Sequence, residues 1–233
     1  MEHRIRLVDG LTGTKSNMRE TPKVYRQQSL GEEIANSISH GVGFLLSVAI
    51  TPILIIAAIP SGTIAIVGAS IFGASMMILY ISSTLYHAFP HSRTKRVFQI
   101  FDHGAIFLLI AGTYTPFTLS VLQGVWGWAL FGIVWSLAII GVVIKSVGGP
   151  GTSKLSIGLY LGMGWMAVLA VKPLWNSLPG WGIFWLLAGG LMYTAGVVFF
   201  IYDHRIRYHH FVWHLFVLAG TVCHVVAILG YVY

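Results

Sequence analysis

The sequence has few charged residues for its length. Asp, Glu, Lys and Arg make up 9% of the 233 residues, whereas a soluble domain carries roughly 25%. Hydrophobic residues make up 56% of the chain. A chain with so little charge cannot cover a soluble fold with polar side chains, so the composition excludes the soluble class and predicts an integral membrane protein.

Cysteine is also scarce, because Cys223 is the only one in the chain. A single cysteine excludes an intrachain disulfide and any metal site built from several thiolates. The formal net charge of +7 is compatible with nucleic-acid binding. However, the basic residues lie between apolar stretches and not along one polar face, so we expect no nucleic-acid partner.

Long apolar stretches dominate the rest of the sequence. A bilayer core about 30 Å thick needs about 20 helical residues, and a helix satisfies its own backbone hydrogen bonds in lipid. We place the stretches at residues 34–58, 64–87, 103–122, 125–144, 155–172, 180–201 and 209–232. They predict an all-α bundle of seven transmembrane helices over residues 31–233, preceded by a flexible basic tail over residues 1–30.

The connections between the stretches carry an uneven distribution of Lys and Arg. Thirteen of these residues fall on the side of the N-terminal segment, and Lys172 alone falls on the other. Positive residues are enriched in cytoplasmic connections. We therefore expect a plasma-membrane protein with its N-terminus in the cytoplasm and its C-terminus outside.

Acidic residues are almost absent from the apolar region. Asp102 is the only carboxylate between Glu33 and Asp203. We place it at the cytoplasmic end of the third helix, after a loop that turns at Pro90 and carries Arg93, Lys95 and Arg96. An isolated acid in a membrane helix is energetically expensive and usually has a function and a partner.

Histidines suggest that partner. His210 and His214 are four residues apart on the seventh helix, and Ser83 and His87 have the same spacing on the second, so each pair shares a helical face. The topology places all four at the depth of Asp102, provided that the second, third and seventh helices are neighbours. A single His-x-x-x-His pair is more often a packing pair, but the shared depth favours a metal site.

Three neutral imidazoles, from His87, His210 and His214, suit Zn²⁺ and leave a fourth position for water. Asp102 would accept a hydrogen bond from that water or act as its base, and Ser83 would orient it or stabilise an oxyanion. In the competing arrangement Asp102 is itself the fourth ligand. His40 is expected to cap its helix or to support a ligand, and His224 to line a cavity.

Taken together, these motifs resemble the hemolysin III branch of the progestin and adipoQ receptor family. The resemblance rests on Ser83-x-x-x-His87, Asp102 and His210-x-x-x-His214, with Glu33, Asn36, Ser39 and His40 near the start of the first helix. It implies seven helices with the N-terminus inside and a zinc ion held by the three histidines, with the aspartate and the serine contacting zinc-bound water. The short loops resemble those of bacterial members.

The resemblance leaves the activity open. Some eukaryotic members of the family are receptors, and some are linked to hydrolysis of ceramide-like amides, whereas the bacterial branch is named for haemolysis and linked to membrane homeostasis. We expect first a zinc-dependent intramembrane hydrolase acting on a lipid amide or ester, with membrane lipid as its substrate or ligand. The alternatives are a non-catalytic receptor or stress sensor with structural zinc, and a hemolysin-like cytolytic protein.

Overall fold

The computed structural model describes residues 26–90, 92–148 and 154–233, and in these ranges seven helical spans are long and apolar enough to cross a membrane. The elements are α1 (Leu30–Ala58), η1 (Ile59–Ser61), α2 (Thr63–Ala88), α3 (Arg93–Pro116), η2 (Phe117–Leu122), α4 (Gly124–Gly148), α5 (Lys154–Gly164), η3 (Met166–Ala170), α6 (Val171–Ser177), α7 (Gly180–Tyr202) and α8 (His209–Tyr231). The predicted all-α membrane bundle is confirmed. Most of the predicted tail, residues 1–25, lies outside the described residues.

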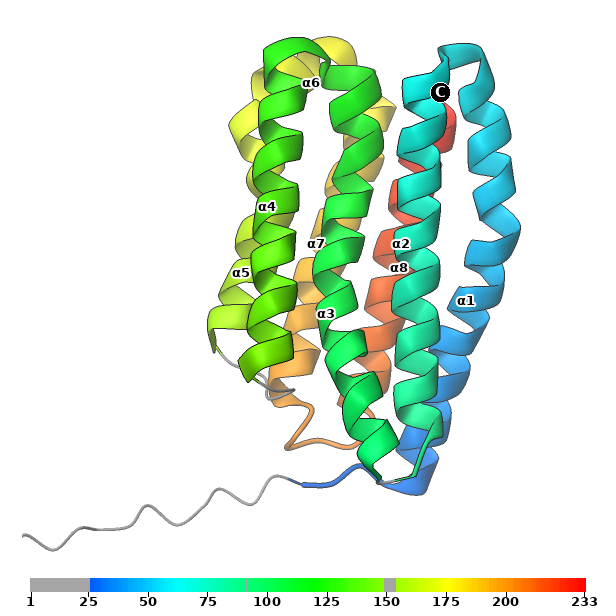
Figure 1. The fold of residues 1–233 in the computed structure, drawn as a ribbon, viewed down its shortest axis with the longest axis vertical. Coiled ribbons are helices and arrows are strands. Elements are labelled where there is room, and N and C mark those ends of the chain that lie inside the picture. Colours follow the sequence, from blue (N-terminus) through cyan, green and yellow to red (C-terminus); the bar gives the residue numbers. More distant parts are fainter. Residues whose placement is uncertain (1–25, 91, 149–153) are drawn as a thin grey trace, which may run out of the picture.

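The seven spans form a closed ring. Spans that follow one another in the sequence pack side by side, and α8 returns to α1 (Figure 1). We call the end at which α1 and α8 begin, and at which α2 gives way to α3, the base of the bundle; it is the lower end in Figure 1. Packing is close among α1, α2 and α3 and between α7 and α8, and it is sparse on either side of α5.

Side-chain caps set where the helices begin at the base. Ser29 caps α1 by accepting a hydrogen bond from the backbone N–H of Glu32, while the Glu32 carboxylate accepts from the backbone N–H of Ser29. Ser92 caps α3 by accepting from the backbone N–H of Lys95. These caps satisfy N–H groups that have no partner within the helix.

The third helix corrects the sequence-based boundary. It begins at Arg93, not at residue 103, so the expected basic loop forms its first turns and Asp102 lies well inside the helix. Hydropathy locates only the part of a helix that lipid surrounds, and the cap at Ser92 starts this one earlier. The early turns are anchored by the ring of Phe98, which stacks on Phe89.

Two spans depart from regular α-helix. At the end of α3, Pro116 is followed by η2, six residues of wider π-helix; proline removes a backbone donor, and such bulges relieve the resulting misfit. The fifth span runs through α5, η3 and α6, so Pro173 lies inside it and does not end it.

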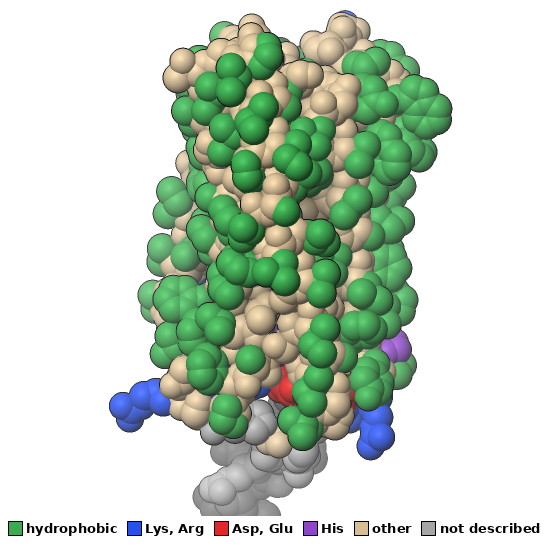
Figure 2. All heavy atoms as spheres, turned by 90° about the vertical axis from the view of Figure 1, so that its right-hand side faces the viewer, with side chains coloured by type: hydrophobic (Ala, Val, Ile, Leu, Met, Phe, Trp, Pro, Cys, Tyr) green, Lys and Arg blue, Asp and Glu red, His purple; other side chains and the backbone are tan. Residues whose placement is uncertain are grey.

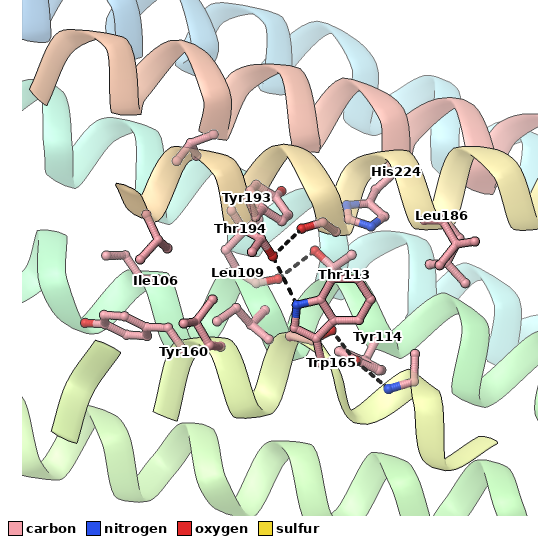
Figure 3. Close-up of a pocket in the computed structure, with 18 of the residues that line it drawn as sticks. Ile106, Leu109, Thr113, Tyr114, Tyr160, Trp165, Leu186, Tyr193, Thr194 and His224 are labelled. Carbon is pink, nitrogen blue, oxygen red and sulfur yellow. Dashed lines mark hydrogen bonds between the residues drawn. The ribbon is translucent and has the colours of Figure 1, made fainter. Parts of the chain in front are cut away.

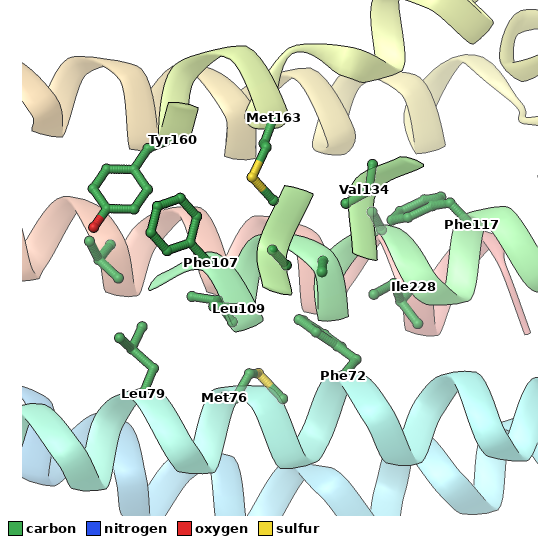
Figure 4. Packing of buried hydrophobic residues seen from close by; sticks show 14 of the residues in the cluster. Phe72, Met76, Leu79, Phe107, Leu109, Phe117, Val134, Tyr160, Met163 and Ile228 are labelled. Carbon is green, nitrogen blue, oxygen red and sulfur yellow. The ribbon is translucent and has the colours of Figure 1, made fainter. Parts of the chain in front are cut away.

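Apolar side chains fill the centre and also cover the outside. Phe72 of α2, Phe107 of α3 and Ile228 of α8 belong to one buried cluster (Figure 4). Figure 2 shows hydrophobic side chains over most of one outer face, with Lys and Arg projecting at the base. A soluble protein would bury such a surface, whereas a bilayer leaves it in contact with lipid.

Candidate metal centre

Three histidines from distant parts of the sequence meet near the base of the bundle. His87 comes from the last turn of α2, and His210 and His214 come from the first turns of α8. Each offers one ring nitrogen, and these nitrogens all lie within 4.8 Å of one another. All three side chains are buried. The assumption that the second and seventh spans are neighbours at this depth therefore holds.

Each of these histidines has an acceptor on its Nδ1 side. His87 Nδ1 lies 2.7 Å from Oε2 of Glu33, and His210 Nδ1 lies 2.8 Å from Oδ2 of Asp203. His214 Nδ1 lies 3.2 Å from the backbone oxygen of Asn36. A carboxylate or a carbonyl only accepts, so Nδ1 carries the hydrogen in each ring.

The Nδ1 contacts leave the lone pair of each imidazole on Nε2. The Nε2 atom of His87 is buried and has no hydrogen-bond partner among the described residues. Metal-ligating histidines characteristically donate their other N–H to a carboxylate or a backbone carbonyl. The three-histidine site therefore has the tautomers and the partners that a divalent transition metal requires.

Asp102 and Ser83 lie beside the three histidines. Both are buried, and the Asp102 carboxyl faces the Ser83 hydroxyl and His210. Ser83 Oγ makes no hydrogen bond within the described residues. The catalytic roles of both residues stay predictions, because their positions are compatible with water-mediated and with direct contact to an ion.

Helix α1 contributes more to the site than the sequence reasoning assigned to it. The Glu33 carboxylate joins two helices, because it accepts from His87 on α2 and, at 2.8 Å, from Lys95 Nζ on α3. The His40 ring stacks on that of His214, with centroids 3.6 Å apart. His40 thus packs against one of the three clustered histidines and does not cap α1.

The contribution of α1 had a second signal in the sequence, besides the motif residues of the first helix. Polar and small residues recur at helical spacing along one face of the otherwise apolar α1, and the structure buries that face: Glu32, Asn36, Ser39, His40, Gly43 and Ser47. Recurrence at three- and four-residue intervals marks the side of a helix that meets its neighbours. This pattern would have extended the expected role of α1 from the motif residues to the whole buried face.

A cluster of charged contacts, which we call the base clasp, ties α1 to the connection between α7 and α8. The Arg26 guanidinium donates to both Glu32 oxygens at 2.7 Å, and the backbone N–H of Tyr208 donates to Glu32 at 2.9 Å. The bond to Glu32 raises the pKa of Arg26 above its ordinary value. Asp203, which holds His210, belongs to this connection and gives its backbone oxygen to Arg26.

A cavity of about 220 Å³ extends from the three-histidine site into the bundle. His40, Asp102, His210 and His214 line one end of it, and most of its remaining wall is apolar. His224 lines it further along α8, as the sequence predicted (Figure 3).

The cavity also reaches the outer surface of the bundle. Val168 and Trp175 of the fifth span line it, and they are 56% and 67% exposed. Leu187 of α7 lines it too and is 49% exposed. The opening thus lies on the lipid-facing side, next to the sparsely packed fifth span.

Fold and site together define a multi-pass membrane protein with a buried three-histidine site that can hold a metal ion. The family model described as "Haemolysin-III related" matches residues 28–225. The chain therefore belongs to the haemolysin-III family, and the resemblance drawn from its motifs is confirmed.

Curated relatives agree with this assignment. Hemolysin-3 of Bacillus cereus is 45% identical over 214 residues, which cover 91% of this chain and 97% of the relative. The Hemolysin-3 homolog of Bacillus subtilis (strain 168) is 47% identical over 204 residues, covering 87% and 95%. The human monocyte to macrophage differentiation factor is 30% identical over 227 residues, covering 94% and 89%.

Proposed function

We propose that this protein is a zinc-dependent hydrolase that cleaves lipid amides or esters within the membrane and serves membrane lipid homeostasis. One observation carries the proposal: two of the three clustered histidines and the buried acid Asp102 line the end of an apolar cavity that opens toward lipid. A lipid chain fits such a cavity, and its polar linkage would lie at the polar end.

The donor set fits zinc, because neutral imidazoles with fixed tautomers are suitable ligands and three of them leave an open position. His87, His210 and His214 would hold the ion. When bound, zinc supplies Lewis acidity to a carbonyl oxygen and lowers the pKa of water.

Asp102 is the residue to which we assign proton transfer. Its carboxylate would take a proton from the attacking water and deliver it to the leaving nitrogen or oxygen, so that hydroxide adds to the carbonyl carbon and the proton leaves with the amine or alcohol. Ser83, which faces Asp102, would donate a hydrogen bond that orients the reacting group. The apolar walls would hold the acyl chain and exclude bulk water.

The test uses zinc-loaded protein in lipid nanodiscs with two probes, an N-acylsphingosine and a monoacylglycerol carrying isotope-labelled acyl chains. Fatty-acid release is measured by mass spectrometry. Asp102→Asn should keep its zinc and lose 10²- to 10⁴-fold in turnover, the usual contribution of a general base. Ser83→Ala should also be slower, whereas Ser82→Ala should match wild type, because Ser82 Oγ donates to the backbone oxygen of Ile78 within its own helix.

Two outcomes of this experiment would contradict the proposal. Normal turnover by Asp102→Asn would remove Asp102 from the mechanism. Release of neither labelled fatty acid by zinc-loaded wild type would overturn the hydrolase proposal.

A non-catalytic receptor or stress sensor is the second candidate. It is favoured by the way the site joins helices, since α2 and α8 provide the histidines, α1 provides acceptors for His87 and His214, and the connection before α8 provides the acceptor for His210. In that case zinc removal should chiefly lower thermal stability. The names of the bacterial relatives suggest haemolysis as a third candidate, which liposome leakage that persists in His214→Ala would support.

We also propose that the base faces the cytoplasm of a bacterial cell. Its support is the Lys and Arg bias toward the base, which follows the positive-inside rule. A single cysteine placed at residue 233, with Cys223 replaced by serine, should react with an impermeant maleimide on intact cells. Labelling only after lysis would reverse the orientation.

A further inference from the structure

A second polar cluster lies in the interior, far from the three-histidine site. His224 of α8 is 5% exposed, and its ring stacks on that of Tyr193 of α7 with centroids 5.4 Å apart. Its Nδ1 atom is buried and has no hydrogen-bond partner among the described residues. A buried polar group without a partner is costly, and in a membrane interior it usually marks a function.

The helices are shaped to make room for these two rings. A Cβ added to Gly189 of α7 would lie 2.6 Å from Nε2 of His224, and a Cβ added to Gly220 of α8 would lie 2.7 Å from the ring of Tyr193. Any side chain larger than hydrogen would displace the rings. Each helix thus carries a glycine opposite the other helix's polar ring, and the position of His224 is built into the fold.

Other polar groups at this level already bond to one another. Tyr80 donates to Thr221 Oγ1 at 2.7 Å, and the Tyr193 hydroxyl lies 2.9 Å from the same oxygen. Thr194 Oγ1 accepts from Trp165 Nε1 at 3.0 Å and donates to the Gly190 backbone oxygen at 2.8 Å (Figure 3). The imidazole of His224 therefore stands out as the group with spare hydrogen-bonding capacity.

A ligand suits this imidazole better than an isolated water does. A buried water needs two to four polar partners, and the neighbouring hydroxyls are engaged, while Ile183, Leu186 and Val217 give the cavity apolar walls. A polar group carried on a lipid chain needs only one hydrogen bond, because the chain itself packs against those walls.

We propose that His224 is a second recognition point of the cavity, which hydrogen-bonds a hydroxyl or carbonyl group within the chain of a bound lipid. His224 follows His214 by ten residues on α8, which is about 15 Å along the helix. The ligand class is therefore a lipid with one polar group at the three-histidine site and another about 15 Å along its chain. The inference rests on the proposed role of the cavity in binding lipid.

The experiment compares two probes that differ in one group. Stearate and 12-hydroxystearate have the same chain, and the hydroxyl of the second lies about as far from its carboxylate as His224 lies from His214. Equilibrium binding of the tritiated lipids to zinc-loaded protein in nanodiscs should favour the hydroxylated probe by about tenfold, the effect of one good buried hydrogen bond. 2-Hydroxystearate should bind no more tightly than stearate.

Substitutions test whether the His224 side chain causes the preference for 12-hydroxystearate. His224→Phe keeps a ring beside Tyr193 without a nitrogen, so it should bind both probes equally and keep its zinc. Gly189→Ala keeps the histidine but displaces its ring, and it should lose much of the preference. Val222→Leu, on the exposed face of α8, should keep the full preference.

The outcomes separate this inference from the proposed function. Equal binding of the two probes by wild type, or a preference that survives in His224→Phe, overturns the inference and leaves the lipid cavity intact. Failure of wild type to bind either probe counts against the cavity as a lipid site, and with it against the proposed function.

Discussion

Helix α8 carries histidines at two levels, and the protein holds them in different ways. At the base, His210 and His214 donate from Nδ1 to Asp203 and to the backbone of Asn36, and the third histidine, His87, donates to Glu33. At mid-height, His224 is equally buried, but its Nδ1 has no partner in the described chain.

The comparison shows that burial alone does not define a metal site. A fixed Nδ1–H directs the lone pair of Nε2 toward a common centre, which is what a metal requires. At His224 the ring is packed against Tyr193, and its Nδ1 has no partner among the described residues. The same residue type is thus held in two ways, and its hydrogen-bond partners make the difference.

The largest expected effect comes from removing a ligand at the base. His214→Ala leaves two of the three clustered imidazoles, and we expect metal affinity to fall by more than about 100-fold, beyond the 10- to 100-fold typical of losing an outer partner. Metal per chain is measured by mass spectrometry on detergent-purified protein. His209→Ala is the matched control, because His209 precedes His210 but lies outside the three-histidine site. Wild-type metal content in His214→Ala would contradict the assignment.

An intermediate effect is expected from replacing Glu33, which accepts the hydrogen bond from His87. Glu33→Gln weakens the acceptor for His87 and leaves Lys95 without its carboxylate, so zinc affinity in a chelator competition should fall by 10- to 100-fold. Lys95→Met keeps the contact between Glu33 and His87 and should cost much less. Unchanged affinity in Glu33→Gln would show that the Nδ1 contacts do not support metal binding.

The smallest effect should come from the base clasp, which reaches the three-histidine site indirectly, through Asp203. Arg26→Gln removes the guanidinium from the buried Glu32, and we expect residues 203–208 to lose about 1 kcal/mol of local stability, since the pair is partly exposed. Hydrogen–deuterium exchange of that segment reports the change. Arg205→Gln, in the same connection, should leave its exchange unaltered. Faster exchange in both variants would point to a general charge effect.

Much of this arrangement was accessible from the sequence. The shortage of charge and the seven apolar stretches predicted the bundle, because lipid imposes helical hydrogen bonding and a minimum length. The spacing of His210 and His214, and the depth of His87 and Asp102, predicted that these side chains lie together near one end of the bundle. Such features depend on helical periodicity and on membrane depth, which are local properties of the chain.

Other features of the site depended on which helices pack side by side. The early start of α3 brought Lys95 to Glu33, and the return of α8 to α1 brought Asn36 and His40 to His214. Hydropathy reports whether a residue lies in lipid, but it does not report which helix faces it.

The sequence by itself determined the class of protein, the number of spans and the side chains available to hold a metal. Only the tertiary structure decided which nitrogen each histidine presents, that α1 supplies two of the three acceptors, and that a cavity connects the three-histidine site with His224. The physical reason is that periodicity and burial are encoded along the chain, whereas hydrogen-bond partners and cavities arise between helices that are distant in sequence.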